Sequence, residues 1–82
     1  MTLSERSLTA GILSGRLKPR DVKDVDASKF ADWTLANIFA IALGARQMGM
    51  EPRTDRIIKV MQMANEPTAG VAELVDKLRA EG

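Results

Sequence analysis

The stretch that decides the fold is Trp33-Thr34-Leu35-Ala36-Asn37-Ile38-Phe39-Ala40-Ile41-Ala42-Leu43-Gly44-Ala45, because it contains no charged residue. Drawn as a helix, it carries large apolar side chains on every side. Such a helix must be surrounded, by its own domain or by something else. Its 13 positions fall short of the roughly 20 apolar residues that span a bilayer. We therefore predict a buried central helix in a protein that does not enter a membrane.

Helix signals continue on both sides of this stretch, whereas the period-two pattern of strands is nearly absent. The central helix is expected over residues 27–48, after a cap at Asp26 or Ser28. Three residues mark its end. Gly49 can adopt the left-handed turn, Met50 can make the apolar contact that follows it, and Pro52 prevents the helix from continuing.

The first helix is expected over residues 3–14, with Thr2 and Glu5 as a capping box and Gly15 after its end. A short helical turn should follow, starting at Pro19 and held to the core by Val22 and Val25. Thr54 and Thr68 are the expected caps of the third and fourth helices. Their apolar stripes are Ile57, Val60, Met61 and Ala64 in the third, and Val71, Leu74, Val75 and Leu78 in the fourth.

The third helix also carries Ile58 and Met63 away from its stripe, so we expect little of its surface to be wetted. Asp76, Lys77, Arg79 and Glu81 should face solvent on the fourth. The predicted fold is all-α: one compact four-helix domain, residues 1–82, around a buried central helix, with a short helical turn between helices one and two.

Composition argues against enzymatic chemistry. The 82 residues include no cysteine and no histidine, so disulfides, thiolate metal sites and the commonest general base are absent. We expect no catalytic residue, no cofactor and no bound metal. Twelve basic and eleven acidic residues give a net charge of +1, which weakens the case for a dedicated nucleic-acid binder. The N-terminus lacks the apolar core of a secretory signal, and we expect a cytoplasmic protein.

A row of small residues at four-residue spacing runs along the central helix at Ala36, Ala40 and Gly44. Such a row lets another helix approach closely. The favoured interpretation is that the third or fourth helix fills it, and the alternative is self-association or a partner surface. The candidate interface residues are Trp33, Ala36, Phe39, Ala40, Gly44, Met48 and Met50.

Two further clusters lie near the turn between the second and third helices. Methionine fills gaps in cores and also lines adaptable binding surfaces. Core filling is the favoured interpretation for this group: Met48, Met50, Met61 and Met63. A candidate basic edge, favoured as a solvated rim over a phosphate site, consists of Arg46, Arg53, Arg56 and Lys59.

The stretch from Arg56-Ile57-Ile58-Lys59 to Thr68-Ala69-Gly70-Val71-Ala72-Glu73-Leu74 resembles the opening of a winged helix-turn-helix. The resemblance covers under a third of the chain, and it implies a DNA-binding regulator. The final helix would then have to enter the groove, with only Lys77 and Arg79 as basic contacts. This is our alternative hypothesis.

Our first hypothesis is a non-enzymatic helical protein that acts through protein–protein contacts. An accessory subunit, an adaptor, or a phage-type assembly or inhibitor protein would fit. The expected partner is another protein or a second copy, with nucleic acid less favoured and no membrane.

Overall fold

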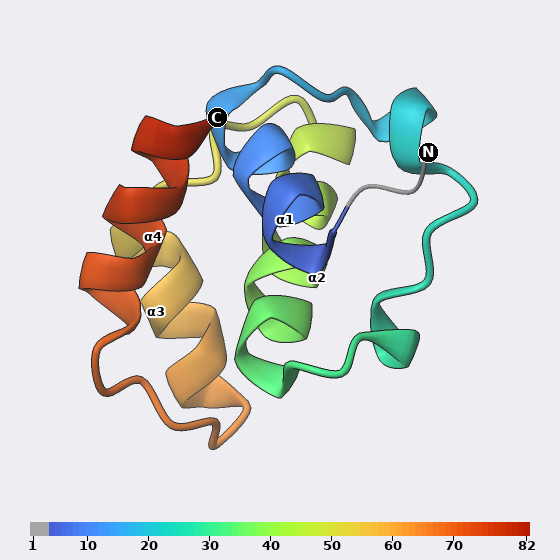
Figure 1. The fold of residues 1–82 in the computed structure, drawn as a ribbon. Coiled ribbons are helices and arrows are strands. Elements are labelled where there is room, and N and C mark those ends of the chain that lie inside the picture. Colours follow the sequence, from blue (N-terminus) through green and yellow to red (C-terminus); the bar gives the residue numbers. More distant parts are fainter. Residues whose placement is uncertain (1–3) are drawn as a thin grey trace.

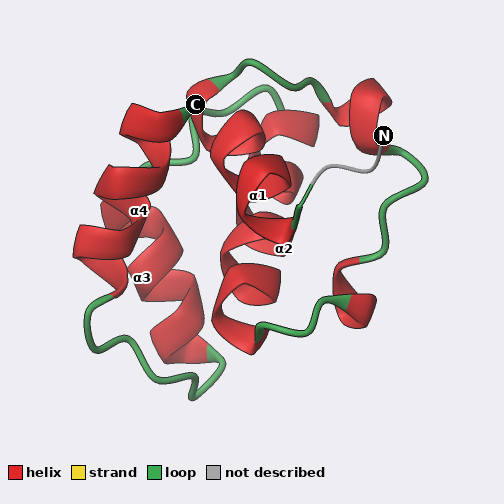
Figure 2. Cartoon of the chain, viewed as in Figure 1, coloured by secondary structure: helices red, strands yellow, loops and turns green. Residues whose placement is uncertain are grey.

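A computed structural model describes residues 4–82 of the chain and confirms the all-α prediction. The helices are α1 (Glu5–Ser14), α2 (Trp33–Gln47), α3 (Thr54–Met63) and α4 (Val71–Glu81). Two short 3-10 turns, η1 (Pro19–Val22) and η2 (Ala27–Lys29), lie between α1 and α2. No strand occurs in residues 4–82 (Figures 1 and 2). The domain measures 32 × 27 × 22 Å.

The helices pack in pairs around one core. α1 packs against both α2 and α4, while α3 packs against α4 and α2. Figure 1 shows α3 and α4 together on one side of the α1–α2 pair, and the η1–η2 segment on the other. Every helix and η1 contribute to the fully buried side chains, which include Ile12, Leu13, Val22, Ile38, Phe39, Ile57, Met61, Val75 and Leu78. The predicted stripe of α4 is therefore its buried face.

α1 begins at Glu5, where the Ser4 side chain accepts a hydrogen bond from the Ser7 amide at 3.0 Å. The expected cap, Thr2, lies outside the described residues. The Glu5 carboxylate accepts hydrogen bonds from the amides of Ala31 at 2.6 Å and Asp32 at 3.1 Å. α1 is thereby tied to the residues that immediately precede α2.

The predicted start of α2 is wrong by six residues. Asp26 caps only the short turn η2, and the chain becomes extended at Phe30. The helix starts after Asp32, whose side chain accepts from the Leu35 amide at 3.0 Å. The predicted end is confirmed: Gly49 is left-handed at φ +74°, and the Met50 amide donates to the Ala45 carbonyl at 2.8 Å. Pro52 is buried behind that turn.

The predicted caps of α3 and α4 are both wrong. Thr54 is the first residue of α3, and its hydroxyl instead contacts Asp76 of α4 at 3.4 Å. Gly70 occupies the cap position of α4 in a left-handed conformation, and no side chain caps that end. α3 is also more exposed than expected. It buries only Ile57 and Met61, because α2 and α4 pack against one side of it.

Two arginines join the ends of three helices, at a site we call the arginine junction. Arg46 of α2 donates to the carbonyls of Ile12 at 3.0 Å and Leu13 at 2.9 Å. Arg79 of α4 donates to the same Leu13 carbonyl at 3.1 Å and to the Pro52 carbonyl. Glu51 forms ion pairs with both guanidinium groups. The expectation that Arg79 faces solvent is thus wrong, because the last carbonyls of α1 need donors.

We expect Arg46→Ala to destabilise the fold, because it leaves the Ile12 carbonyl without its donor in a partly buried position. The expected loss is about 1–3 kcal/mol of unfolding free energy, measured by urea denaturation. Arg46→Lys should recover only part of it, since one ammonium group does not reproduce the planar fork of a guanidinium. Arg20→Ala, at an exposed arginine outside the groove, is the matched control. Equal stability of Arg46→Ala and Arg20→Ala would contradict the structural role of the junction.

Candidate protein-interaction surface

α2 is buried on one side and open on the other. The inward side carries Leu35, Ile38, Phe39 and Ala42, which are at most 8% exposed. On the outward side Trp33 is 60% and Met48 73% exposed, and Ala40 is also exposed. Of the predicted row, Ala36 is buried, Gly44 is partly buried and Ala40 is exposed. No helix of residues 4–82 fills the hollow at Ala40 and Gly44, in contrast to the favoured interpretation. The short helices α1, α3 and α4 cover only part of the α2 surface.

Two shallow hollows follow this open side and meet at Ala40. We call them together the α2 groove. The first hollow, of about 230 Å³, lies between α2 and α3 and is lined by Ala40, Ile41, Gly44, Ala45, Met48, Met50, Arg56 and Val60. The second, of about 200 Å³, lies between α2 and η2 and is lined by Ala27, Ser28, Trp33, Ala36, Asn37 and Ala40. Six of the seven candidate interface residues line this groove.

Phe39 is the exception among the candidate interface residues. It is fully buried, and its ring packs against that of Phe30 with centroids 5.2 Å apart. Phe39 therefore belongs to the core and is not available to a partner. Val60 of α3, which was predicted to lie in the core stripe, instead lines the groove. Its position one residue before the buried Met61 turns it toward the rim.

The methionine cluster divides between core and surface. Met61 is buried, as the core-filling interpretation expects, and Met50 is partly buried. Met48 and Met63 are 73% and 77% exposed, so that interpretation is wrong for both. Flexible, polarisable methionines at a groove rim suit a surface that adapts to a binding partner.

Trp33 stands at one end of the groove, and its indole is hydrogen-bonded to a neighbouring segment. Its Nε1–H donates to the Glu66 carboxylate at 3.0 Å, which ties the start of α2 to the segment after α3. The remaining indole surface faces solvent, although burying an aromatic ring of this size is strongly favourable. Tryptophan is enriched among the residues that carry binding energy at protein interfaces, so the largely exposed Trp33 is a candidate contact residue.

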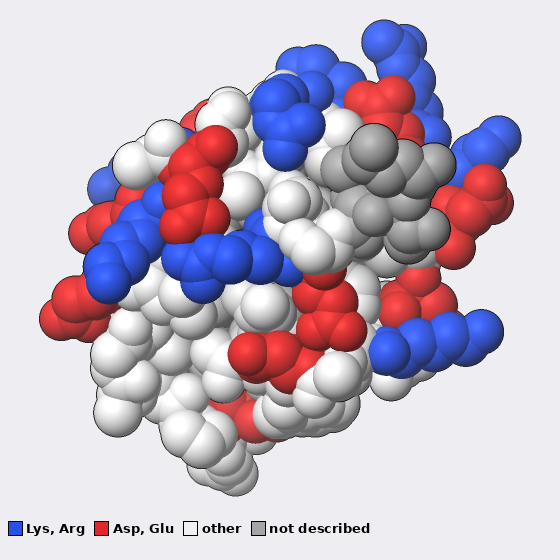
Figure 3. Space-filling view, in the orientation of Figure 1, with Lys and Arg blue, Asp and Glu red and all other residues white. Residues whose placement is uncertain are grey.

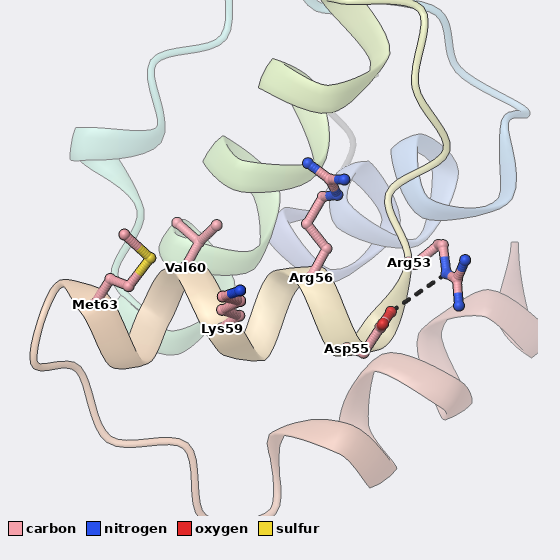
Figure 4. A pocket seen from close by; sticks show the side chains of 6 residues that line it. All are labelled: Arg53, Asp55, Arg56, Lys59, Val60 and Met63. Carbon is pink, nitrogen blue, oxygen red and sulfur yellow. Dashed lines mark ion pairs between the residues drawn. The ribbon is translucent and has the colours of Figure 1, made fainter.

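The four residues of the candidate basic edge do not all lie together. Arg53, Arg56 and Lys59 line a further hollow of about 390 Å³ on α3, together with Asp55, Val60 and Met63 (Figure 4). Arg53 forms an ion pair with Asp55 at 3.3 Å. Arg46 lies apart from this edge because its guanidinium is held in the arginine junction. The three remaining cations form a basic rim beside the α2 groove.

Acidic residues lie at the opposite end of the groove. Asp32 precedes Trp33, Glu66 binds its indole, and Asp26 precedes the lining residues of η2. The side-chain hydrogen bond from Ser28, reinforced by the Ser28 amide, lowers the pKa of Asp26 below its usual range. Lys29 is the one basic residue of η2. The α2 groove therefore runs from an acidic to a basic end.

The DNA-binding alternative depends on the exposed side of α4, which has mixed charge. Glu73, Asp76 and Lys77 are exposed, whereas Arg79 is engaged by the Leu13 and Pro52 carbonyls. Figure 3 shows basic and acidic side chains interspersed over the face that includes α4. This side of α4 offers little positive charge to a phosphate backbone.

Two helix glycines differ in what surrounds them. A Cβ built on Gly11 of α1 would lie 2.5 Å from the Leu17 Cδ1 atom, so internal packing explains that glycine. A Cβ built on Gly44 of α2 meets no atom of residues 4–82 within 4 Å, apart from the adjoining helix backbone. A mid-helix glycine costs about 0.5–1 kcal/mol relative to alanine. Packing within the described chain provides no compensation for that cost at Gly44.

We expect Gly44→Ala to raise the unfolding free energy of the dilute monomer by about 0.5–1 kcal/mol, because it adds helix propensity without a clash. Thermal denaturation should show the gain as a higher Tm, by about 4–8 °C per kcal/mol. Gly11→Ala should give no such gain, since its methyl group displaces Leu17. A loss of stability in Gly44→Ala would show that this glycine has an internal role.

Comparisons with protein families, with curated proteins and with solved structures find no match to this chain, so its function must be argued from its own geometry. Within residues 4–82, no helix combines the length and apolar character needed to cross a membrane. Acidic side chains in the same range do not gather into a group of three or more that could hold a metal ion.

Proposed function

We propose that this protein is a non-enzymatic binding module that acts through protein–protein contacts made by the α2 groove. The observation that carries the proposal is the open row at Ala40 and Gly44. Gly44 keeps the groove floor low, and nothing within the described chain uses that space. A partner helix that packed there would account for a glycine that otherwise only weakens α2.

The energetics favour a protein as the occupant of this surface. Burying one large apolar side chain contributes about 1.5–3 kcal/mol. The groove and its rim offer four such side chains that are at least 40% exposed: Trp33, Met48, Val60 and Met63. Contiguous apolar surface with a polar rim is characteristic of interaction sites on small proteins. The charged rim at Arg56 and Glu66 would add orientation to the apolar contact.

Several roles are consistent with such a module, and all of them operate by binding. An accessory subunit, an adaptor, and an assembly or inhibitor protein of the phage type each need a fixed apolar surface and no catalytic group. The absence of histidine and cysteine supports a non-catalytic role. A cytoplasmic location is part of this proposal. The DNA-binding alternative has less support, because Arg79 is engaged inside the fold.

The proposal is tested by placing a photo-crosslinking amino acid at position 40 and, as a control, at position 80. Ala40 and Ala80 are both exposed alanines on helices, but only Ala40 lies in the groove. In the source cell we expect a discrete crosslinked product from position 40 and none from position 80. The mass of the product distinguishes a second copy from a different protein.

An additional Gly44→Leu change should abolish crosslinking from position 40, because the longer side chain fills the groove floor. Circular dichroism of the purified variant verifies that it remains helical. Absence of any product from position 40, or equal products from both positions, would overturn the proposed function.

A further inference from the structure

We propose that the occupant of the α2 groove is a second copy of this chain, with the two α2 helices antiparallel across a two-fold axis near Ala40. The inference rests on the proposed function, because it names the partner for the same surface. It follows from how charge is distributed along the groove.

The groove carries opposite charges at its two ends. Glu66 and Asp32 flank Trp33 at the start of α2. Arg56 lines the hollow beside Gly44 and Met48 near the end of α2, with Arg53 and Lys59 on the same rim. Asp55 is paired with Arg53, and Glu51 with the arginine junction, so the excess positive charge of this end comes from Arg56 and Lys59. A partner that fits this surface must present the reverse order of charge.

A second copy presents that order when it is turned end for end. A two-fold axis perpendicular to α2 near Ala40 brings the Trp33 end of one copy over the Met48 end of the other. Arg56 of each copy then faces Glu66 of its partner, so each attractive contact occurs twice. A parallel arrangement would instead place the basic ends together. The antiparallel arrangement also opposes the two helix dipoles favourably.

The shape of the groove agrees with this arrangement. Ala40 would lie against its exposed counterpart, and Gly44 over the hollow floored by the buried Ala36 of the other copy, where small side chains permit close helix contact. Trp33 would cover the exposed Met48 of the partner, so the largest exposed side chains would bury one another. A short chain without a disulfide or metal gains stability from such association.

The decisive experiment is a charge exchange between the two ends of the groove. Sedimentation equilibrium from about 1 to about 500 µM should show the wild-type chain passing from its monomer mass to twice that mass. Arg56→Glu and Glu66→Arg should each raise the dimer Kd by about 10-fold or more, because each opposes like charges twice. The double variant should return to within about 3-fold of the wild-type Kd, because it restores both pairs in reverse.

Matched controls separate this contact from general effects on the fold. Lys77→Glu changes an exposed charge on α4 and should leave the Kd unchanged, as should Ala80→Glu. Ala40→Glu should abolish dimerisation. Glu66→Gln keeps an acceptor for the Trp33 indole and should weaken the dimer less than Glu66→Arg. Trp33 is the single tryptophan of the chain, and its emission should shift to shorter wavelength as the dimer forms.

A wild-type chain that stays monomeric across this range overturns the dimer, as does a double variant no tighter than the single ones. Dimerisation that Ala40→Glu leaves unchanged overturns it as well, because the contact then lies elsewhere. If the chain is monomeric and position 40 crosslinks to a different protein, the dimer is wrong and the proposed function stands. If position 40 gives no product at all, the proposed function fails by its own test.

Discussion

The bonds from Arg46 to the last carbonyls of α1 and the burial of Phe39 and Ala42 together fix which side of α2 faces the core. Arg46 lies four and seven residues after Ala42 and Phe39, which places it on the same side of the helix. Anchoring its guanidinium at Ile12 and Leu13 therefore directs that side inward. The row at Ala40 and Gly44 must then face outward. Arg46, which does not line the groove, thus helps to hold outward the part of α2 that a partner can reach.

Much of the fold could be predicted from local patterns. The end of α2 at Gly49 and the buried stripe of α4 depend on residues near each other in sequence, and both were predicted correctly. The start of α2 was not, because the amides of Ala31 and Asp32 are bound by Glu5, 26 and 27 residues away. The role of Arg79 was missed for the same reason. Its carbonyl acceptors belong to other segments, and no local pattern signals them.

The position of the candidate surface could be predicted from the sequence, but whether another helix of the chain fills it could not. The four-residue spacing of Ala36, Ala40 and Gly44 identifies a groove from sequence alone. Whether the groove is filled depends on how much surface the other helices cover, which requires their packing. α3 leaves the groove unfilled, because it buries only Ile57 and Met61 and presents Val60 and Met63 at the rim. Val60, which was predicted to lie in the core stripe, and Met63 therefore extend the open surface of α2.

The arginine junction also has a consequence for the order of folding. Its donors are separated from the Leu13 carbonyl by 33 residues for Arg46 and by 66 for Arg79. Contacts of such long sequence separation require most of the chain to be ordered before they form, and they slow folding. We therefore expect α1 to become helical before its last carbonyls receive these donors, and the junction to form late in folding.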